Sequence, residues 1–187
     1  MKRLPVFITG NQEKANRLGR LLGLELEHLK LDLDEIQSSD PSVVIDHKAR
    51  QAYGAVSKPV LVDDASMWFN ALNGLPGPLI KLFVHAPSGL ENLCRMADGL
   101  ASRRATAQAY FGIYDGETMT IMHGEISGEI ADHPRGNGGF THGWDNVFCL
   151  DGHGGKTLAE LSQKEFDEVY AQIRPIAKLK KYLEEKL

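Results

Sequence analysis

This sequence of 187 residues has few cysteines, no long apolar run and no excess of positive charge. The two cysteines, Cys94 and Cys149, form no CxxC pair and no Cys/His zinc spacing, which excludes a disulfide framework and favours two reduced thiols. No stretch approaches the roughly 18 apolar residues of a membrane helix, and the apolar run behind Met1 is too short for the core of a signal peptide. We therefore expect a soluble, cytoplasmic protein.

The charge balance is slightly acidic, with 21 Lys+Arg against 25 Asp+Glu and a formal net charge of −4. Proteins that coat nucleic acids or bind anionic membranes need a strong excess of basic charge, so we expect neither a nucleic-acid polymer nor a membrane as partner. A small anionic ligand held by a few local lysines stays compatible with this balance. The chain is long enough for roughly one domain, whose core needs no disulfide or structural metal.

Hydrophobic periodicity predicts strands and helices that alternate in the first part of the chain. Strands are expected at 4–9, 24–31 and 59–62, and helices at 11–22 and 41–56. Asn11 is suited to cap the first helix and Gly23 to end it. Asp40 followed by Pro41 is a typical start for the second helix.

The rest of the chain predicts a hairpin and a final helical segment. Short helices broken near Pro87 and Gly99, β-rich runs at 104–114 and 117–131, and a polar helical segment at 158–187 follow in that order. The dipeptide Asp115-Gly116 is the strongest hairpin signal in the chain. The final segment turns these apolar side chains towards a core: Leu161, Phe166, Val169, Ile173, Ala177 and Leu183. We therefore predict an α/β fold with a mixed sheet, in one domain over residues 1–187.

The first candidate site is the junction between the first strand and the first helix, Thr9-Gly10-Asn11-Gln12-Glu13-Lys14. Free N–H groups and the positive end of the helix dipole favour a phosphate there, and glycine lets a ligand approach the backbone. Lys14 lies one turn after Asn11 and can reach back to the same anion. A strand, a glycine and a capping residue also begin ordinary helices, so this pattern leaves both interpretations open.

The second candidate is Asp63-Asp64, which we expect at the end of an apolar strand. Successive strand residues point to opposite faces, so the two carboxylates should not chelate one ion together unless the strand bends. We expect one of them to face a cleft and the other to accept a structural hydrogen bond. Carboxylates at this edge of a sheet are typical of ligand sites in α/β folds, although an ordinary strand end is the alternative.

Glu35, Lys48 and Lys81 are the remaining candidates. Lys48 is predicted at the edge of the apolar stripe of the second helix. Lys81 stands inside an otherwise apolar run, 78–84, which predicts a mostly buried segment. A surface lysine is usually only solvated, so no lysine identifies a site by itself. The chain has no HExxH motif, so we expect no histidine metal site. It has no GxSxG motif and no cysteine with a local partner that would activate it, so we expect no side-chain nucleophile.

Several blocks of the sequence, in their order from residue 4 to residue 161, carry a more specific signal. They are Phe7-Ile-Thr-Gly-Asn-Gln-Glu-Lys14, Leu33-Asp-Glu-Ile-Gln-Ser38, Lys48-Ala-Arg-Gln-Ala-Tyr53, Pro59-Val-Leu-Val-Asp-Asp64, Phe69-Asn-Ala-Leu-Asn-Gly-Leu-Pro-Gly-Pro-Leu-Ile-Lys-Leu-Phe83, Gly143-Trp-Asp145, Asp151-Gly152 and Lys156-Thr-Leu-Ala-Glu-Leu161. Together they resemble the inosine/xanthosine triphosphate pyrophosphatase (Ham1-type) family, whose members hydrolyse deaminated purine nucleotides. The run 69–83 is the most specific of them.

This resemblance implies a homodimer of two-lobed α/β subunits with a long twisted mixed sheet and a nucleotide in the cleft between lobes. It implies a Mg²⁺-dependent hydrolase that releases pyrophosphate and a nucleoside monophosphate. By position, the triphosphate would be held by Thr9, Gly10, Asn11 and Lys14, with Lys48 and Lys81 adding positive charge. Glu35 and Asp64 would bind Mg²⁺, and Asp64 would also activate the attacking water. Gly143, Trp144 and Asp145 would lie in the nucleoside pocket.

The chain departs from the family pattern at three places. Ala65 follows the candidate catalytic aspartate where the family has Thr or Ser, and Thr141-His142 separates Phe140 from Gly143. The family's Lys and Ser-His-Arg, which bind the 6-oxopurine base, are replaced by Phe166 and Tyr170-Ala171-Gln172. The phosphate chemistry is therefore expected to persist while the choice of base is open.

Three functions follow as hypotheses. The first is hydrolysis of non-standard purine nucleotides such as ITP, dITP or XTP. The second is the same reaction on a different or modified base, since Phe166 and Tyr170 would offer stacking in place of charged donors. The third is a non-catalytic nucleotide-binding or sensing protein, which the retention of both Glu35 and Asp64 disfavours.

Overall fold

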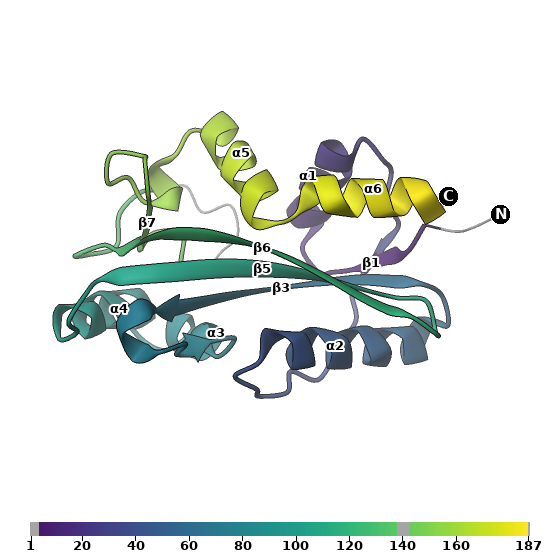
Figure 1. Ribbon diagram of the computed structural model, residues 1–187, viewed down its shortest axis with the longest axis horizontal. Helices are drawn as coiled ribbons and strands as arrows, with labels where there is room; N and C mark the ends of the chain where they lie inside the picture. The colour runs from purple at the N-terminus through teal and green to yellow at the C-terminus, as the bar shows by residue number, and fades with distance from the viewer. Residues whose placement is uncertain (1–3, 138–142, 187) are drawn as a thin grey trace. The chain divides into compact units, whose positions relative to one another are not determined.

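The computed structural model describes residues 4–137 and 143–186, and these form a seven-stranded mixed sheet flanked by helices (Figure 1). The strands are β1 (Val6–Ile8), β2 (His28–Leu29), β3 (Val60–Phe69), β4 (Pro76–Gly77), β5 (Arg104–Tyr114), β6 (Met119–Ile130) and β7 (Phe148–Leu150). The helices are α1 (Gln12–Leu22), α2 (Pro41–Val56), α3 (Ile80–Val84), α4 (Gly89–Asp98), α5 (Gln163–Ile173) and α6 (Ile176–Lys186), with short 3-10 turns at Asn70–Leu72 and Leu158–Glu160.

The strands follow the order β2-β1-β3-β5-β6-β7, and β4 pairs with β3 beside this path. β1 pairs in parallel with β2 and β3, whereas β3–β4 and β6–β7 are antiparallel pairs. The predicted α/β class with a mixed sheet is therefore confirmed. No helix among the described residues is both long enough and apolar enough to cross a membrane.

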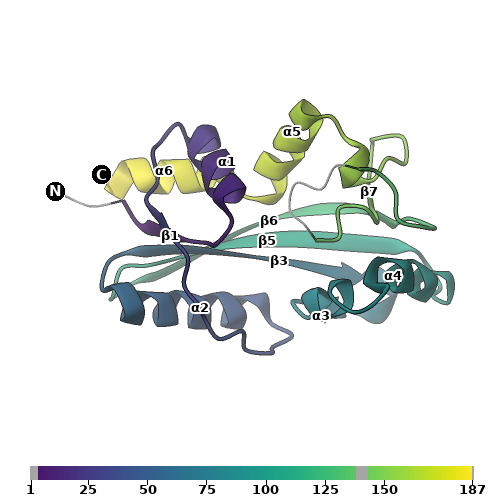
Figure 2. The ribbon, with the colours of Figure 1, turned by 180° about the vertical axis from the view of Figure 1, so that it is seen from behind.

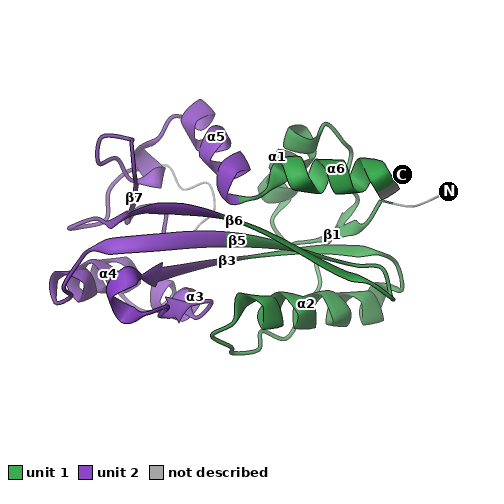
Figure 3. Ribbon diagram, viewed as in Figure 1, with its two compact units in different colours: residues 1–64, 109–124, 174–187 green, residues 65–108, 125–173 purple. Residues whose placement is uncertain are grey.

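Residue contacts divide the chain into two compact units (Figure 3). Unit 1 contains residues 1–64, 109–124 and 174–187, and unit 2 contains residues 65–108 and 125–173. The chain passes from one unit to the other within β3, β5 and β6, and again immediately before α6.

In unit 1, α1 and α6 lie side by side on one face of the strands and α2 covers the opposite face (Figures 1 and 2). The buried side of α2 is formed by Ile45, Ala49 and Ala52. These side chains pack in one core cluster with Val60 and Val62 of β3. The helix stripe and the strand therefore bury each other.

Both helices of unit 1 that precede β3 begin as their capping residues predict. The side chain of Asn11 accepts a hydrogen bond from the backbone N–H of Lys14, and Gly23 ends α1 in the left-handed conformation. Asp40 accepts from the N–H of Ser42, and Pro41 occupies the first turn of α2.

In unit 2, α3 and α4 lie on one face of the strands, and α5 lies on the other (Figure 1). The predicted breaks near Pro87 and Gly99 are confirmed, because α4 begins after the first and ends before the second. The hairpin signal Asp115-Gly116 is also confirmed, since it connects β5 to β6 in unit 1. Oδ1 of Asp115 accepts hydrogen bonds from the backbone N–H groups of Glu117 and Thr118 in this turn.

Three boundaries differ from the sequence prediction. β2 has two residues where 24–31 was expected as a strand. β3 continues past Asp64 to Phe69, because its second half gains a partner in β4. The expected helical segment 158–187 is interrupted at Arg174-Pro175, and the new helix starts with a different phase.

That change of phase corrects one predicted core residue. Ala177 is exposed, whereas Ile176 and Leu179 of α6 are buried. The remaining predicted core side chains of this segment are buried, namely Leu161, Phe166, Val169, Ile173 and Leu183. The predicted core positions were therefore correct before the proline, and after it Ala177 was wrong and Leu183 was correct.

A glycine in β5 sets the distance between α2 and the sheet. A Cβ at Gly112 would lie 2.9 Å from Cγ1 of Ile45 and 3.2 Å from Cγ2 of Val62, both fully buried. We expect Gly112→Ala to lower the free energy of unfolding by about 1–3 kcal/mol through overpacking, measured by urea denaturation. Gly54→Ala is the matched control, because a Cβ at that exposed position of α2 meets nothing within 4 Å.

The control is expected to change stability in the opposite direction. Alanine is a better helix former than glycine by roughly 1 kcal/mol, so Gly54→Ala should stabilise the protein slightly. Equal stability of Gly112→Ala and the unsubstituted protein would contradict the close packing of α2 on β5.

Candidate phosphate and carboxylate site in unit 1

The register of β1 and β3 brings the first two candidate sites together. Val6 pairs with Val60 and Phe7 with Leu61, in parallel. Continuing this register by two residues places Thr9 opposite Asp63. Because β1 ends at Ile8, the turn into α1 lies beside the middle of β3 rather than beside its end. The expectation that the two aspartates end a strand is therefore wrong, but their place next to the helix start follows from the shorter neighbouring strand.

Asp63 is buried and paired with two cations. Its carboxylate lies 2.8 Å (Oδ2) from Nζ of Lys14 on α1 and 3.3 Å from Nη2 of Arg174, which precedes α6. Burial acts to raise the pKa of Asp63, but the charges of Lys14, Arg174 and Lys48 outweigh it and lower the pKa to about 2. Asp63 is thus charged at neutral pH and connects Lys14 of α1 to Arg174, which precedes α6.

Asp64 has a different environment, as the alternation along a strand predicts. Its side chain is 25% exposed, and Oδ1 lies 3.6 Å from Nζ of Lys48 on α2. The same ammonium donates a hydrogen bond of 3.1 Å to the backbone carbonyl of Asp63. Burial raises the pKa of Asp64, and the negative charges of Asp63 and Glu35 add to this effect against the opposing charge of Lys48. A carboxylate with a raised pKa is a better proton acceptor.

The negative charge of Glu35 is close enough to Asp64 to raise the pKa of Asp64. These two carboxylates offer the hard oxygen ligands that Mg²⁺ prefers. Among the described residues no group of three His, Cys, Asp or Glu side chains could hold a metal. Mg²⁺ commonly binds through one or two carboxylates together with water and substrate phosphates, so the pair fits this ion when a phosphate supplies further oxygens.

The start of α1 presents hydrogen-bond donors beside Asp63. The N–H of Asn11 donates to Oγ1 of Thr9 over 3.1 Å, and Oδ1 of Asn11 caps the helix. In the described part of the chain, Nδ2 of Asn11 has no hydrogen-bond partner. The stem of Lys30 crosses Gly10, since a Cβ there would lie 3.1 Å from Cγ and Cδ of that lysine. Lys30 is an exposed cation at the same loop that the sequence analysis did not identify.

Arg174 is the other residue that the sequence analysis missed. The sequence predicts it within a polar helical segment, yet it is only 4% exposed. An arginine directly before a proline, inside a segment that otherwise has helical periodicity, marks a helix break that can turn the side chain inward. This signal was present in the sequence, but its partner Asp63 lies 111 residues away.

The remaining predicted site residues belong to unit 2. Lys81 is exposed on α3, where only Ile80 is buried, so the predicted buried segment is wrong. The short helix is the reason, because five residues bury a single position. Trp144 and Asp145 are buried, and the Trp144 ring lies 5.4 Å from that of Phe148. Gly143 is half-buried beside them. The departure at Phe140, Thr141 and His142 lies outside the described residues.

The structure therefore divides the predicted site residues into two groups. In unit 1 it brings together residues from the start of α1, from the segment before α2, from α2 and from β3. They are Thr9, Gly10, Asn11, Lys14, Glu35, Lys48, Asp63 and Asp64. In unit 2 it places Lys81, Gly143, Trp144 and Asp145. The roles of both groups are predictions.

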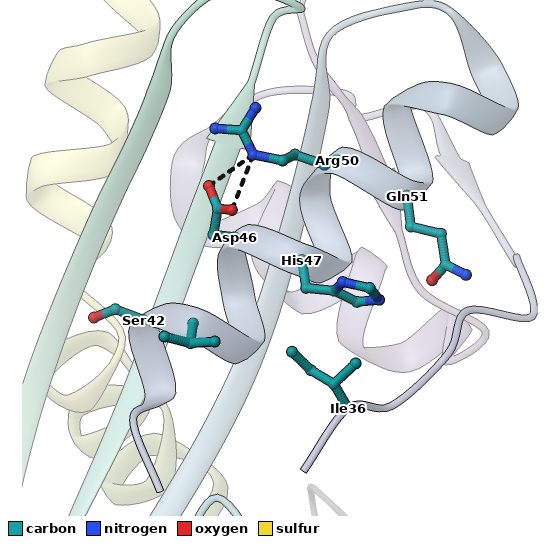
Figure 4. Close-up of a pocket in the computed structure, with 7 residues that line it drawn as sticks. Ile36, Ser42, Asp46, His47, Arg50 and Gln51 are labelled. Carbon is teal, nitrogen blue, oxygen red and sulfur yellow. Dashed lines mark hydrogen bonds and ion pairs between the residues drawn. The ribbon is translucent and has the colours of Figure 1, made fainter. Parts of the chain in front are cut away.

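A separate open groove runs along α2 in unit 1 (Figure 4). Its lining consists of Ile36, Ser42, Val43, Asp46, His47, Arg50 and Gln51. Arg50 is directed towards Asp46, and Nε lies 2.9 Å from Oδ2, so these two charges neutralise each other. Arg50 is therefore paired with Asp46 and is not a free cation for a phosphate in this groove.

The buried ion pairs of Asp63 make a prediction about acid stability. Its pKa of about 2 lies below the ordinary value of 3.8, so its contribution is complete above pH 4 and is lost as the pH falls towards 2. We expect urea unfolding without metal to show a loss of about 2 kcal/mol over this range. Asp63→Asn should lose 3–5 kcal/mol at pH 7, an order-of-magnitude value for breaking a buried pair, and should respond less to acid.

Asp46→Asn is the control for that experiment, because its ion pair with Arg50 is exposed. Exposed pairs contribute about 0–1 kcal/mol. Equal acid responses of the unsubstituted protein and Asp63→Asn would refute the assignment of the acid-sensitive step to Asp63.

Known proteins match this chain over nearly its whole length. The Ham1 family profile matches residues 5–182. The chain is 38% identical to an inosine triphosphate pyrophosphatase of Yarrowia lipolytica, with 97% of this chain and 96% of that protein covered. It is 36% identical to inosine triphosphate pyrophosphatase 2 of Trypanosoma cruzi, with 93% and 89% covered.

Solved structures give the same result at the level of the backbone. A HAM1 protein from Coxiella burnetii superposes with a TM-score of 0.82 at 26% identity, over 96% of this chain and 98% of that one. A Ham1 protein from Staphylococcus aureus superposes with a TM-score of 0.79 at 25% identity. The sequence match over nearly the whole chain and the shared fold lead to one conclusion: this chain belongs to the Ham1 family.

Proposed function

We propose that this protein is a Mg²⁺-dependent nucleoside triphosphate pyrophosphohydrolase. It cleaves between the α- and β-phosphates of non-standard purine nucleotides such as ITP, dITP or XTP. The observation that carries the proposal is the pair Asp63-Asp64, where one carboxylate anchors Lys14 and the other keeps a raised pKa next to Lys48. The relatives from Yarrowia lipolytica and Trypanosoma cruzi, both inosine triphosphate pyrophosphatases, support the same reaction.

In this proposal the triphosphate binds at the start of α1. Backbone N–H groups at the helix start, Nδ2 of Asn11 and the ammonium groups of Lys14 and Lys48 form its cationic surroundings. Fixed donors and positive charges stabilise the charge that develops on phosphorus oxygens during phosphoryl transfer. The helix start and the lysines thus bind the substrate and lower the barrier with the same groups.

Asp64 is the proposed general base, and Asp64 and Glu35 would hold Mg²⁺. The ion, when bound, supplies positive charge at the phosphate oxygens and helps to acidify a water molecule. Asp64 accepts a proton from the attacking water, whose oxygen forms a bond to the α-phosphorus. The bond between that phosphorus and the bridging oxygen breaks, and pyrophosphate leaves. The products are a nucleoside monophosphate and pyrophosphate.

The nucleoside end is assigned to Gly143, Trp144 and Asp145 of unit 2, and Lys81 is a further proposed phosphate contact. The alternative of a different base rested on stacking by Phe166 and Tyr170. Both rings are 3% exposed or less, with centroids 6.2 Å apart, so neither offers a free face to a base. A re-tuned pocket therefore finds no support from these aromatic rings, and the homodimer stays a prediction.

Incubation with a panel of ribo- and deoxynucleoside triphosphates and Mg²⁺ tests the proposal, with products identified by ³¹P NMR. We expect pyrophosphate and a nucleoside monophosphate, with ITP, dITP or XTP hydrolysed faster than ATP or GTP. Orthophosphate as the product, or no turnover of any nucleotide, would rule the reaction out. Tight nucleotide binding without turnover would instead support a sensing protein.

The role of Asp64 is tested by Asp64→Asn, which removes the base and a metal ligand while it keeps the shape of the side chain. Turnover should fall by at least ~10², because both general base catalysis and metal binding are affected. Asp46→Asn is again the control, since it removes a carboxylate from α2 outside the cluster. Turnover of Asp64→Asn near that of the control would refute the assignment.

A further inference from the structure

Asp63 forms ion pairs with two cationic side chains, so the group of Asp63, Lys14 and Arg174 has two positive charges and one negative charge. Lys14 Nζ lies 3.0 Å from Oδ1 and 2.8 Å from Oδ2, so a single lysine already contacts both carboxylate oxygens. Arg174 nevertheless adds a second cation, with Nη2 and Nε at 3.3 and 3.4 Å from Oδ2. The three groups together carry one positive charge in excess.

The two cations differ in their access to solvent. The side chain of Arg174 is 5% exposed, whereas that of Lys14 is 23% exposed. Lys14 also sits in the first turn of α1, beside the N–H groups and Asn11 of the proposed phosphate site. The excess positive charge is therefore presented to a ligand by Lys14, and Arg174 stays inside.

A pair of Lys14 and Asp63 without a second cation would be neutral. Its field would largely cancel at a nearby phosphate, because an ammonium bound to both oxygens of a carboxylate forms a compact dipole. A guanidinium is always charged, and it balances the same carboxylate from the buried side. The lysine then keeps a positive charge for a second anion.

We propose that Arg174 is a positioning residue of the phosphate site, which neutralises Asp63 from inside so that Lys14 remains available to the substrate phosphates. The inference rests on the proposed function for the identity of the ligand. It goes beyond that function because Arg174 itself touches neither substrate nor metal. It also assigns Asp63 a second role, since the carboxylate orients Lys14 and has its own charge cancelled by another residue.

The place of Arg174 in the chain explains why it can have this role. It is the first residue after α5, directly before Pro175, and its segment returns the chain to unit 1. Asp63 and Asp64 are the last residues of unit 1 before β3 continues into unit 2. The ion pair between Arg174 and Asp63 therefore attaches the last segment of unit 1 directly to β3, the strand that carries both aspartates.

Binding of inorganic tripolyphosphate, measured by titration calorimetry with Mg²⁺ present, tests the proposal without any need for turnover. For Arg174→Met we expect about 10-fold weaker binding, the order of magnitude for losing one charge-assisted contact. Steady-state kinetics should show a similar rise of KM for the nucleotide with a smaller change in kcat. Arg174→Lys should recover part of the loss, because a lysine keeps the charge but not the planar geometry.

A double variant separates charge compensation from a purely structural role. Asp63→Asn/Arg174→Met removes one charge of each sign, so Lys14 regains an uncompensated positive charge. We expect it to bind tripolyphosphate more tightly than Arg174→Met alone. If Arg174 only supports the fold, the double variant should bind no better than the single one, and that result would overturn the proposal.

Arg104→Met is the control, because Arg104 forms an ion pair of 2.6 Å with Asp151 in unit 2, away from the cluster in the chain. It should bind tripolyphosphate like the unsubstituted protein. Near-UV circular dichroism confirms that each variant is folded. If the unsubstituted protein binds tripolyphosphate but hydrolyses no nucleotide, the proposed function fails while the role of Arg174 is still tested. Unchanged binding by folded Arg174→Met would refute that role.

Discussion

The buried carboxylate of Asp63 connects β3 to two cationic side chains from other parts of unit 1. A charge at 4% exposure requires partners, and it obtains them from α1 through Lys14 and from the start of the last segment through Arg174. These contacts attach two helices to one strand on one face of the sheet (Figure 1). The ion pair with Lys14 thus holds the start of α1 next to β3.

The alternation of side chains along β3 gives neighbouring residues separate tasks. Asp63 turns to α1 and the C-terminal segment, whereas Asp64 turns to Lys48 on α2. A helix on each face of the strand therefore contributes one lysine to the same pair of residues. One carboxylate is held charged by its cations, while the other is kept partly open with a raised pKa. This division between an anchor and a reactive group is what the proposed hydrolysis requires.

Prediction from the sequence succeeded where the cause of a structure is local. The caps at Asn11 and Asp40, the stop at Gly23 and the Asp115-Gly116 turn are all properties of a few adjacent residues. It failed where a distant partner decides the outcome. β3 is long because β4 pairs with its second half.

Periodicity, capping residues and ordered motifs along the chain predicted the α/β class, the family and the residue types of the proposed phosphate site. Three features became visible only in three dimensions: Asp63 is buried, Asp64 is more exposed, and Arg174 contacts the same carboxylate as Lys14. The physical reason is that charge compensation depends on distance in space. The residues that neutralise Asp63 lie 49 and 111 positions away, and no local pattern joins them.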